Sequence, residues 1–318
     1  MRFYDHKSLL NECREQLEAR KLSDLEIIRE VRRRDPEIII NKIIWSEALW
    51  KLDRRPYYDL YPSVIEAFAR TKFDIPISSI KSPMPAVLIR LPYGNGLTYN
   101  DRELRTLMIW DERLQHLQNI AELRALGEHA QADKAAKTQP TNTLMLQPDY
   151  GEHHKNKYGH RVSHVQVFQL RRDSDQLLTE WLADIKDPLA AGMQSEANTE
   201  QARRLFRIMT ALCLLGDNPD LIEPLVLDKD RELFERTQDP ALVEKAVGKG
   251  KRGWAVGARL SAAAGFRRPH FGYRWTGPGK TIPKLVPIKG CIVRRQKLEE
   301  IPTGYLDDLT DVTPLEQS

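Results

Sequence analysis

Cysteines and long apolar segments are scarce in this sequence of 318 residues. Its three cysteines, Cys13, Cys213 and Cys291, are few, odd in number and widely spaced, which argues against a disulfide framework or a cysteine-based zinc site and fits a reducing compartment. No run of about eighteen or more apolar residues occurs, so no membrane-spanning helix is expected. The N-terminal residues also lack the apolar core and cleavage site of a secretory signal. These absences together predict a cytoplasmic protein.

Common catalytic and metal-binding motifs are also missing. The sequence contains no G-x-S-x-G, H-E-x-x-H or G-x-G-x-x-G element. Residues 277–281 (GPGKT) resemble part of a phosphate-binding loop, but the full spacing is absent and no helix pattern follows, so this segment is predicted to be a turn. His153, His154, His160 and His164 lie close together, but no acidic or cysteine ligand completes a site, which favours a solvated loop. We therefore expect no bound metal and no cofactor.

Acidic residues are absent from one long stretch. Residues 245–297 contain 14 Lys and Arg and no Asp or Glu, whereas the rest of the chain has 35 basic and 45 acidic residues, a net charge of −10. Such segregation of charge bears on binding partners, because a concentrated positive patch attracts anions.

The apolar patterns predict an α+β fold with N-terminal helices, central antiparallel strands, a buried helix and a small basic C-terminal module of irregular and β structure. Helical periodicity, apolar β-branched runs and Gly or Pro boundaries support these assignments. Helices are predicted over residues 9–17, 62–72, 177–185, 200–215 and, more briefly, 253–264. A capping box at residues 23–26 predicts another helix start, and residues 35–36 a further one before the apolar run 38–50. The predicted strands are 85–91, 142–147, 162–170 and 285–293, with 104–110 ambiguous, 127–141 a helix or a loop and 148–160 a polar loop. Two units follow: a scaffold domain over residues 1–240 and a basic module over residues 241–318 packed on it.

The basic module supplies the candidate binding residues. Its cations can neutralise phosphates, and its aromatic rings can stack on unpaired bases at about 1–3 kcal/mol per base. Arg also pairs with carboxylates, so an acidic protein segment competes with RNA as the predicted partner. A third alternative is that the module only docks on the acidic body of the same molecule. The candidate residues are Arg267, Arg268, His270, Tyr273, Arg274, Trp275, Lys280, Lys284, Arg294 and Arg295.

His270 also raises the alternative of an enzyme acting on RNA or a nucleotide, since a neutral imidazole beside cations can serve as a general base. No partner carboxylate, Ser or Cys lies nearby in the sequence to complete such a site. The sequence therefore favours a non-enzymatic binding protein.

The order Arg268-Pro269-His270, then Trp275-x-Gly277, then an apolar strand with Pro287, is similar to the C-terminal signature of a phage and plasmid protein family. Its best-known member is a type V-A anti-CRISPR protein. More weakly, the helix and apolar strand over residues 58–68 and 85–92 also resemble that family, as does the helix over 203–215 with the Asn-Pro that follows. The present sequence departs from the signature in one place, because the stretch between His270 and Trp275 is shorter and a His-Trp pair is missing.

The resemblance implies a protein of a mobile genetic element that suppresses a defence process of its bacterial host. The anti-CRISPR member lowers expression of the type V nuclease through its message and nascent chain. For this chain the implied partners are RNA or an acidic protein segment, such as the nascent chain of a CRISPR nuclease, and no membrane.

Overall fold

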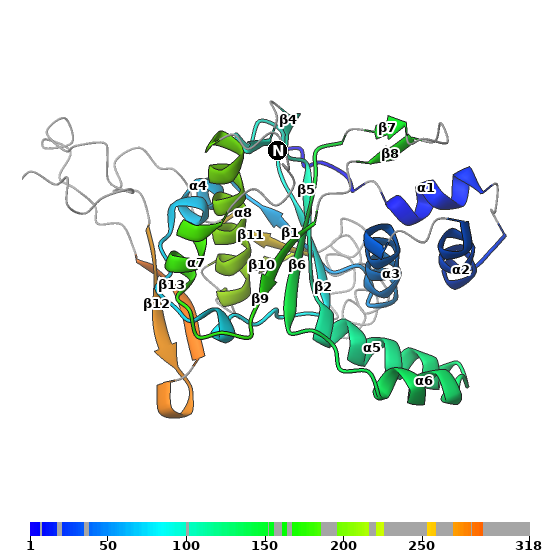
Figure 1. Cartoon of the computed structure of the whole chain (residues 1–318). Helices are drawn as coiled ribbons and strands as arrows, with labels where there is room; N and C mark the ends of the chain where they lie inside the picture. The colour runs from blue at the N-terminus through cyan, green and yellow to red at the C-terminus, as the bar shows by residue number, and fades with distance from the viewer. Residues whose placement is uncertain are drawn as a thin grey trace, which may run out of the picture.

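A mixed seven-stranded sheet forms the centre of the protein, with helices on both of its faces (Figure 1). The computed structural model describes residues 1–6, 8–17, 21–34, 38–99, 102–151, 153–155, 161–163, 167–185, 196–215, 221–225, 253–258, 270–280 and 282–288. The α+β class predicted from the sequence is confirmed.

The sheet combines an antiparallel half with a short parallel part. Its strand order is β10-β11-β1-β2-β5-β6-β9. The pairs β2–β5, β5–β6 and β6–β9 are antiparallel, which confirms the predicted meander, whereas β1 runs parallel to both β2 and β11. The strands are β1 (Tyr57–Leu60), β2 (Ala86–Arg90), β5 (Thr106–Asp111), β6 (Thr143–Asp149), β9 (Phe168–Arg171), β10 (Ile222–Pro224) and β11 (Gly253–Val256).

Helices cover the sheet as two separate layers (Figure 1). One layer consists of α4 (Pro62–Arg70), α7 (Leu178–Asp184) and α8 (Glu196–Leu214). The opposite side carries α1 (Leu9–Gln16), α2 (Asp24–Arg34) and α3 (Ile38–Leu52). On that side α5 (Glu112–Ala125) and α6 (His129–Ala136) extend away from one end of the sheet.

Alternation along the strands divides the apolar residues between two cores. In β2, Val87 and Ile89 face the α4–α7–α8 layer, while Ala86 and Leu88 face the α1–α3 layer. This follows from the two-residue period of a strand. Because both faces are covered, all six residues of β5 are buried, and this explains why its sequence has no clear alternation of polar and apolar residues.

Helix α8 is the main apolar element of the first core. Ile208, Met209 and Ala211 are fully buried, so the prediction of a buried helix is confirmed. Phe206 meets the ring of Trp181 edge-on at 4.8 Å and that of Phe168 at 5.9 Å. Such edge-to-face pairs add about 0.5–1.5 kcal/mol beyond the area they bury.

Two strands next to each other in the sheet differ from the prediction. The sequence predicted a short helix over residues 253–264, but Gly253–Val256 is strand β11. Residues 259–264 lie outside the described ranges. Tertiary contacts override local preference here: a Cβ on Gly253 would lie 2.3 Å from Cζ of Tyr57, so glycine lets the two strands approach. Strand β1 was not predicted, because it is short and contains Asp59.

Smaller elements refine the remaining predictions. The ambiguous segment 104–110 contains all of β5 except Asp111, and the segment 127–141 contains α6. The predicted polar loop 148–160 includes β7 (His153–Lys155), which pairs with β8 (Arg161–Ser163). The other short elements are β3 (Thr98–Tyr99), β4 (Arg102–Glu103) and the 3-10 turns Ile77–Ser79 and Pro278–Lys280. Among the described helices, none combines the length and the apolar character that a membrane crossing requires.

Candidate functional site

The basic module contains β11 of the central sheet and, beyond it, a described β-hairpin. The sequence predicted irregular and β structure here, and its predicted strand over residues 285–293 overlaps the second strand of the hairpin. Strand β12 (His270–Thr276) pairs antiparallel with β13 (Ile282–Ile288) over its full length. The predicted turn between them is confirmed: Gly277 and Gly279 have positive φ angles of 78° and 70°, a conformation that glycine adopts without strain.

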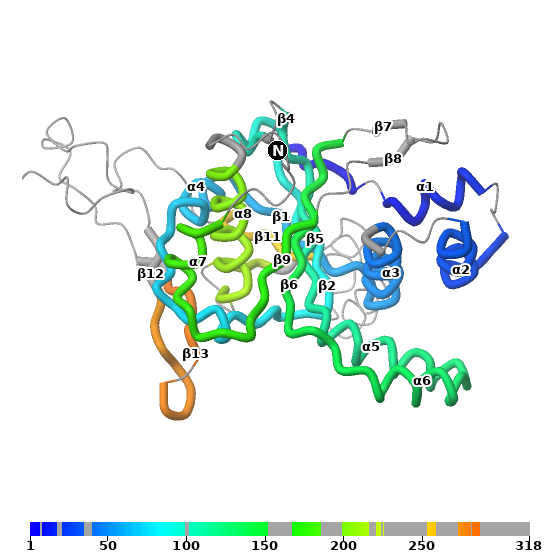
Figure 2. Tube along the Cα trace, viewed as in Figure 1, coloured from blue at the N-terminus to red at the C-terminus, as the bar shows by residue number. Residues whose placement is uncertain are grey.

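One face of this hairpin docks on the scaffold. Leu285 is fully buried in the first core, and Pro283 on the same face is buried as well. Opposite Leu285, the hydroxyl of Tyr273 donates a hydrogen bond to the backbone oxygen of Asp74 at 2.9 Å. Burial, together with the nearby Asp74 charge, raises the pKa of Tyr273 above its ordinary value. The hairpin thus lies against the α4 and α8 side of the protein, and its turn projects beyond the helices (Figure 2).

The other face of the hairpin carries a pair of like charges. Arg274 and Lys284 stand directly opposite each other across the two strands. Like charges at such positions destabilise a sheet, and neither side chain forms an ion pair with a described residue. Arg274 is exposed and Lys284 is half-buried, while Lys280 adds an exposed cation in the turn. A bound anion would relieve this repulsion.

An aromatic ring and an apolar side chain are exposed near the turn. Trp275 is 38% exposed and Ile282 is 50% exposed. The ring of Tyr273 meets that of Trp275 edge-on, with 6.2 Å between the centroids, which limits the orientations open to the indole. In the register of the hairpin Trp275 stands opposite Pro283, on the face away from Arg274 and Lys284, and its partly exposed indole can stack on a planar group.

The hairpin brings five of the ten predicted site residues together: Tyr273, Arg274, Trp275, Lys280 and Lys284. The backbone of His270 pairs with that of Ile288 at the end of the hairpin away from the turn. The other four, Arg267, Arg268, Arg294 and Arg295, lie outside the described residues. The enzyme hypothesis built on His270 stays a prediction, as does the division into units at residue 240.

Of the predicted histidine cluster, His153 and His154 lie in β7, whereas His160 and His164 lie outside the described residues. In the described ranges, no group of three or more His, Cys, Asp or Glu side chains is placed to hold a metal ion.

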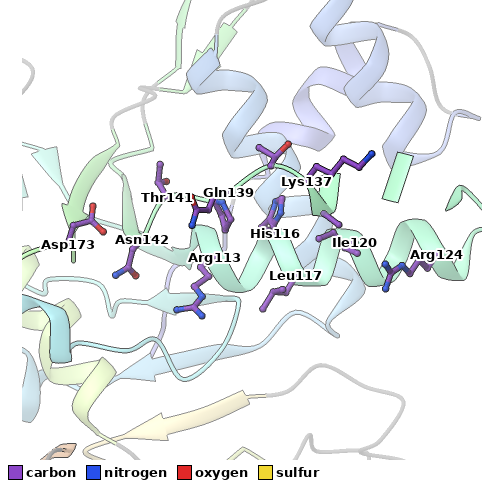
Figure 3. A pocket seen from close by; sticks show the side chains of 13 residues that line it. Arg113, His116, Leu117, Ile120, Arg124, Lys137, Gln139, Thr141, Asn142 and Asp173 are labelled. Carbon is purple, nitrogen blue, oxygen red and sulfur yellow. The ribbon is translucent and has the colours of Figure 1, made fainter. Parts of the chain in front are cut away.

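Sequence reasoning missed an open pocket of about 1050 Å³ beside α5 (Figure 3). Arg113, Leu117, Ile120 and Arg124 line it from α5, at intervals of four, three and four residues. These intervals place them on one helical face, and this spacing is the local signal in the sequence for one wall of the pocket. The other lining residues are His116, Ala136, Lys137, Thr138, Gln139, Pro140, Thr141, Asn142 and Asp173.

A smaller cavity of about 220 Å³ lies between α3 and α5, next to the open pocket. Its polar side chains bind one another: Lys42 pairs with Glu112 at 2.7 Å, and Ser46 donates to Gln115 at 2.8 Å. Because these groups already have partners, the smaller cavity is explained as part of the α3–α5 packing.

Comparison with known proteins gives a similarity to solved structures. No protein-family profile matches the sequence, and no curated protein matches it. Among solved structures, the chain is similar to the crystal structure of AcrVA2, with a TM-score of 0.46 and 15% sequence identity, over 90% of this chain and 93% of that chain. At that TM-score and identity, the similarity says nothing about function.

Proposed function

We propose that this protein binds single-stranded RNA through the β12–β13 hairpin, by the cations of its exposed face and the side chains at its turn end. The observation that carries the proposal is the cross-strand pair of Arg274 and Lys284, two cations held opposite each other without a described ion-pair partner. Natural sheets favour opposite charges at such positions, so a pair that weakens the hairpin is best accounted for by an anionic ligand.

The way the hairpin docks argues against a purely structural role for these cations. Contact with the scaffold is made by Leu285, Pro283 and the hydroxyl of Tyr273, which lie on the face opposite to Arg274 and Lys284. The described cations therefore do not serve to neutralise the acidic scaffold. They remain available to an external partner.

The aromatic content of the hairpin favours RNA over an acidic peptide. Trp275 pairs with Pro283 and so lies on the face opposite to Arg274 and Lys284, but it is 38% exposed close to the turn, where Lys280 adds an exposed cation. Phosphate neutralisation by the cations and stacking of a base on Trp275 can therefore both occur at the turn end of the hairpin. This combination is typical of single-strand binders that read little or no sequence.

The biological role that we propose follows from the C-terminal signature, Arg268-Pro269-His270 and Trp275-x-Gly277. As that resemblance implies, the protein acts for a mobile element in the bacterial cytoplasm and suppresses a host defence process. An anti-CRISPR activity that lowers expression of a type V-A nuclease through its message would use an RNA-binding hairpin directly.

A salt titration with a labelled RNA of about 20 unpaired nucleotides tests the binding proposal. For single strands, log K falls against log salt with a slope of about −0.7 per neutralised phosphate. The double substitution Arg274→Ala/Lys284→Ala is expected to make the slope shallower by about 1.4. The matched control, Lys21→Ala/Lys134→Ala, removes two exposed cations on the other side of the sheet and should leave the slope unchanged.

The aromatic contribution is tested separately with Trp275→Ala. Loss of one stacked base is expected to cost about 1–3 kcal/mol of binding free energy. Tyr93→Ala removes a ring that is 59% exposed outside the hairpin and serves as the control. Absence of RNA binding at low salt, or equal behaviour of the hairpin and control variants, would contradict the proposal. Binding of an acidic peptide but not RNA, lost in the same variants, would replace RNA by the protein partner.

A further inference from the structure

Two apolar side chains of α5 line the open pocket between two arginines. Arg113 and Arg124 lie at the two ends of the lined stretch, with Leu117 and Ile120 between them (Figure 3). Leu117 is 56% exposed on the face of α5 that lines the pocket. An exposed apolar stripe rimmed by charged residues is a feature of interaction surfaces.

The rim of this groove is positively charged. Lys137, from the segment after α6, adds a third cation, and Asp173 is the one acidic side chain among the described residues that line the pocket. Arg124 lies 3.7 Å from Asp133 in an exposed pair, which contributes little. Arg113 and Lys137 form no ion pair with any described residue. The groove therefore offers unneutralised positive charge on both sides of an apolar strip.

We propose that this groove, lined by Arg113, Leu117, Ile120, Arg124 and Lys137, is a docking site for an acidic amphipathic helix of a partner protein. Arg113 and Arg124 are eleven positions apart, and this corresponds to about 16 Å along α5. A partner helix of about three turns would span this length, with apolar residues at helical spacing against Leu117 and Ile120 and carboxylates at both ends. This inference is independent of RNA binding by the hairpin, which lies on the opposite side of the sheet.

Charge complementarity favours an acidic partner, and the apolar side chains that line the groove favour a peptide over a nucleic acid. Apart from His116, no aromatic side chain lines the described pocket, so a nucleic acid would find cations but little surface on which to stack. Leu117 and Ile120 instead match the aliphatic side chains of an amphipathic helix.

Fluorescence anisotropy with a designed peptide tests the groove in the full-length protein. The probe is a fluorescein-labelled helical peptide of about 16 residues, in which two leucines four positions apart are flanked by glutamates. A second peptide carries lysine in place of every glutamate. Binding of the acidic peptide, weakening as salt rises, and no binding of the lysine peptide are expected.

Paired variants locate the binding. Leu117→Lys should weaken the acidic peptide about tenfold or more, a loss of about 1.4 kcal/mol. Leu126→Lys is its matched control, because Leu126 ends the same helix, is 65% exposed and does not line the pocket. Arg113→Glu should likewise weaken binding about tenfold. Lys134→Glu, an exposed cation of α6 outside the pocket, should not. Circular dichroism checks that all four variants fold.

Three results would overturn the proposal. One is no binding of the acidic peptide, and another is binding that Leu117→Lys and Arg113→Glu leave unchanged. The third is binding of the labelled RNA that the same two variants abolish, which would assign the groove to a nucleic acid. Arg274→Glu in the hairpin should leave peptide binding unchanged, so a failure of this proposal is distinguishable from a failure of the RNA proposal.

Discussion

Arginine side chains pair with buried carboxylates in the central scaffold, whereas the cations of the C-terminal hairpin have no such partner among the described residues. In the scaffold, Arg172 and Asp111 are each 5% exposed and pair at 2.8 Å. On the hairpin, Arg274 and Lys284 face each other and have no ion-pair partner among the described residues. The scaffold thus uses arginine to satisfy buried carboxylates, whereas the hairpin presents cations to the outside.

A second scaffold arginine shows the same use. Arg90 donates two hydrogen bonds to Asp59 on the neighbouring strand, at 2.6 and 2.8 Å, and its guanidinium lies over the ring of Tyr57 at 4.4 Å. Such a fork-like pair needs the planar group of arginine. The number of basic residues alone therefore says little about binding, because the role of each basic side chain depends on whether a carboxylate of the same protein pairs with it.

The largest effect is expected from removing a scaffold cation. Arg172→Met leaves Asp111 buried without its ion pair and removes the hydrogen bond from Arg172 to the backbone oxygen of Ile80. Loss of one partner of a buried pair costs about 3–5 kcal/mol of unfolding free energy. Arg274→Met on the hairpin is the matched control and should change stability by about 0.5 kcal/mol or less. Urea unfolding measures both, and similar losses for the two variants would remove the distinction.

The two faces of the hairpin provide the next test, using neighbouring residues of β13. Leu285→Ala removes a fully buried side chain and is expected to cost about 2–5 kcal/mol. Lys284→Ala removes an outward cation and should cost about 0.5 kcal/mol or less. Hydrogen exchange of the hairpin amides should quicken in the first variant alone. Faster exchange in Lys284→Ala would mean that the lysine holds the hairpin in place.

The elements that could be predicted from the sequence are those with a recognisable pattern within their own segment. Helix α8 shows helical periodicity, and strands β2 and β6 are apolar runs with clear boundaries. Strands β1 and β11 could not be found this way, because each is four residues long and is defined by pairing across almost two hundred residues. Long-range pairing leaves no pattern in either segment alone.

The same limit applies to the candidate site. Composition alone identified a basic module and its residues, including Arg274 and Lys284. That these two stand opposite each other depends on the register of the hairpin, which is set by a turn of two positive-φ glycines. The α5 groove depends on how the segment after α6 returns along α5, and no residue motif encodes that path.

A buried scaffold carboxylate gives a prediction that depends on pH. Glu47 is fully buried and accepts hydrogen bonds from Leu9 N at 3.0 Å, Leu10 N at 2.9 Å and Ser8 Oγ at 2.7 Å. Burial alone would raise the pKa of Glu47. The imidazole of His6, whose Nε2 lies 3.3 Å from Glu47 Oε1, and the hydrogen bonds from Leu10 and Ser8 outweigh burial and lower the pKa below its ordinary value of 4.5.

Glu47→Gln is therefore expected to lower the unfolding free energy by about 1–3 kcal/mol at neutral pH. A lowered pKa in the folded state means that the ionised form contributes its stability fully above the unfolded value of 4.5 and loses it as pH falls through the folded value. The difference between wild type and variant should thus shrink below about pH 4.5. Urea unfolding at several pH values measures it, with Glu15→Gln on α1 as an exposed control. A difference that grows on acidification would contradict the assignment.

The smallest effect on stability, and the most direct on function, is expected from reversing one hairpin charge. Arg274→Glu turns a like-charge cross-strand pair into an opposite-charge pair with Lys284 and should raise the unfolding free energy by about 0.2–1 kcal/mol. The same change should weaken RNA binding, since it replaces a phosphate-binding cation by an anion. Lys280→Glu is the control, because Lys280 lies in the turn outside the paired positions and should weaken RNA binding without raising stability.

A gain in stability with a loss of binding would show that the repulsion between Arg274 and Lys284 is maintained for the ligand. If Arg274→Glu instead lowers stability, Arg274 has a carboxylate partner in the folded protein, and the hairpin would use its cations as the scaffold does. Since the two outcomes have opposite signs, a thermal unfolding curve of this one variant decides between them.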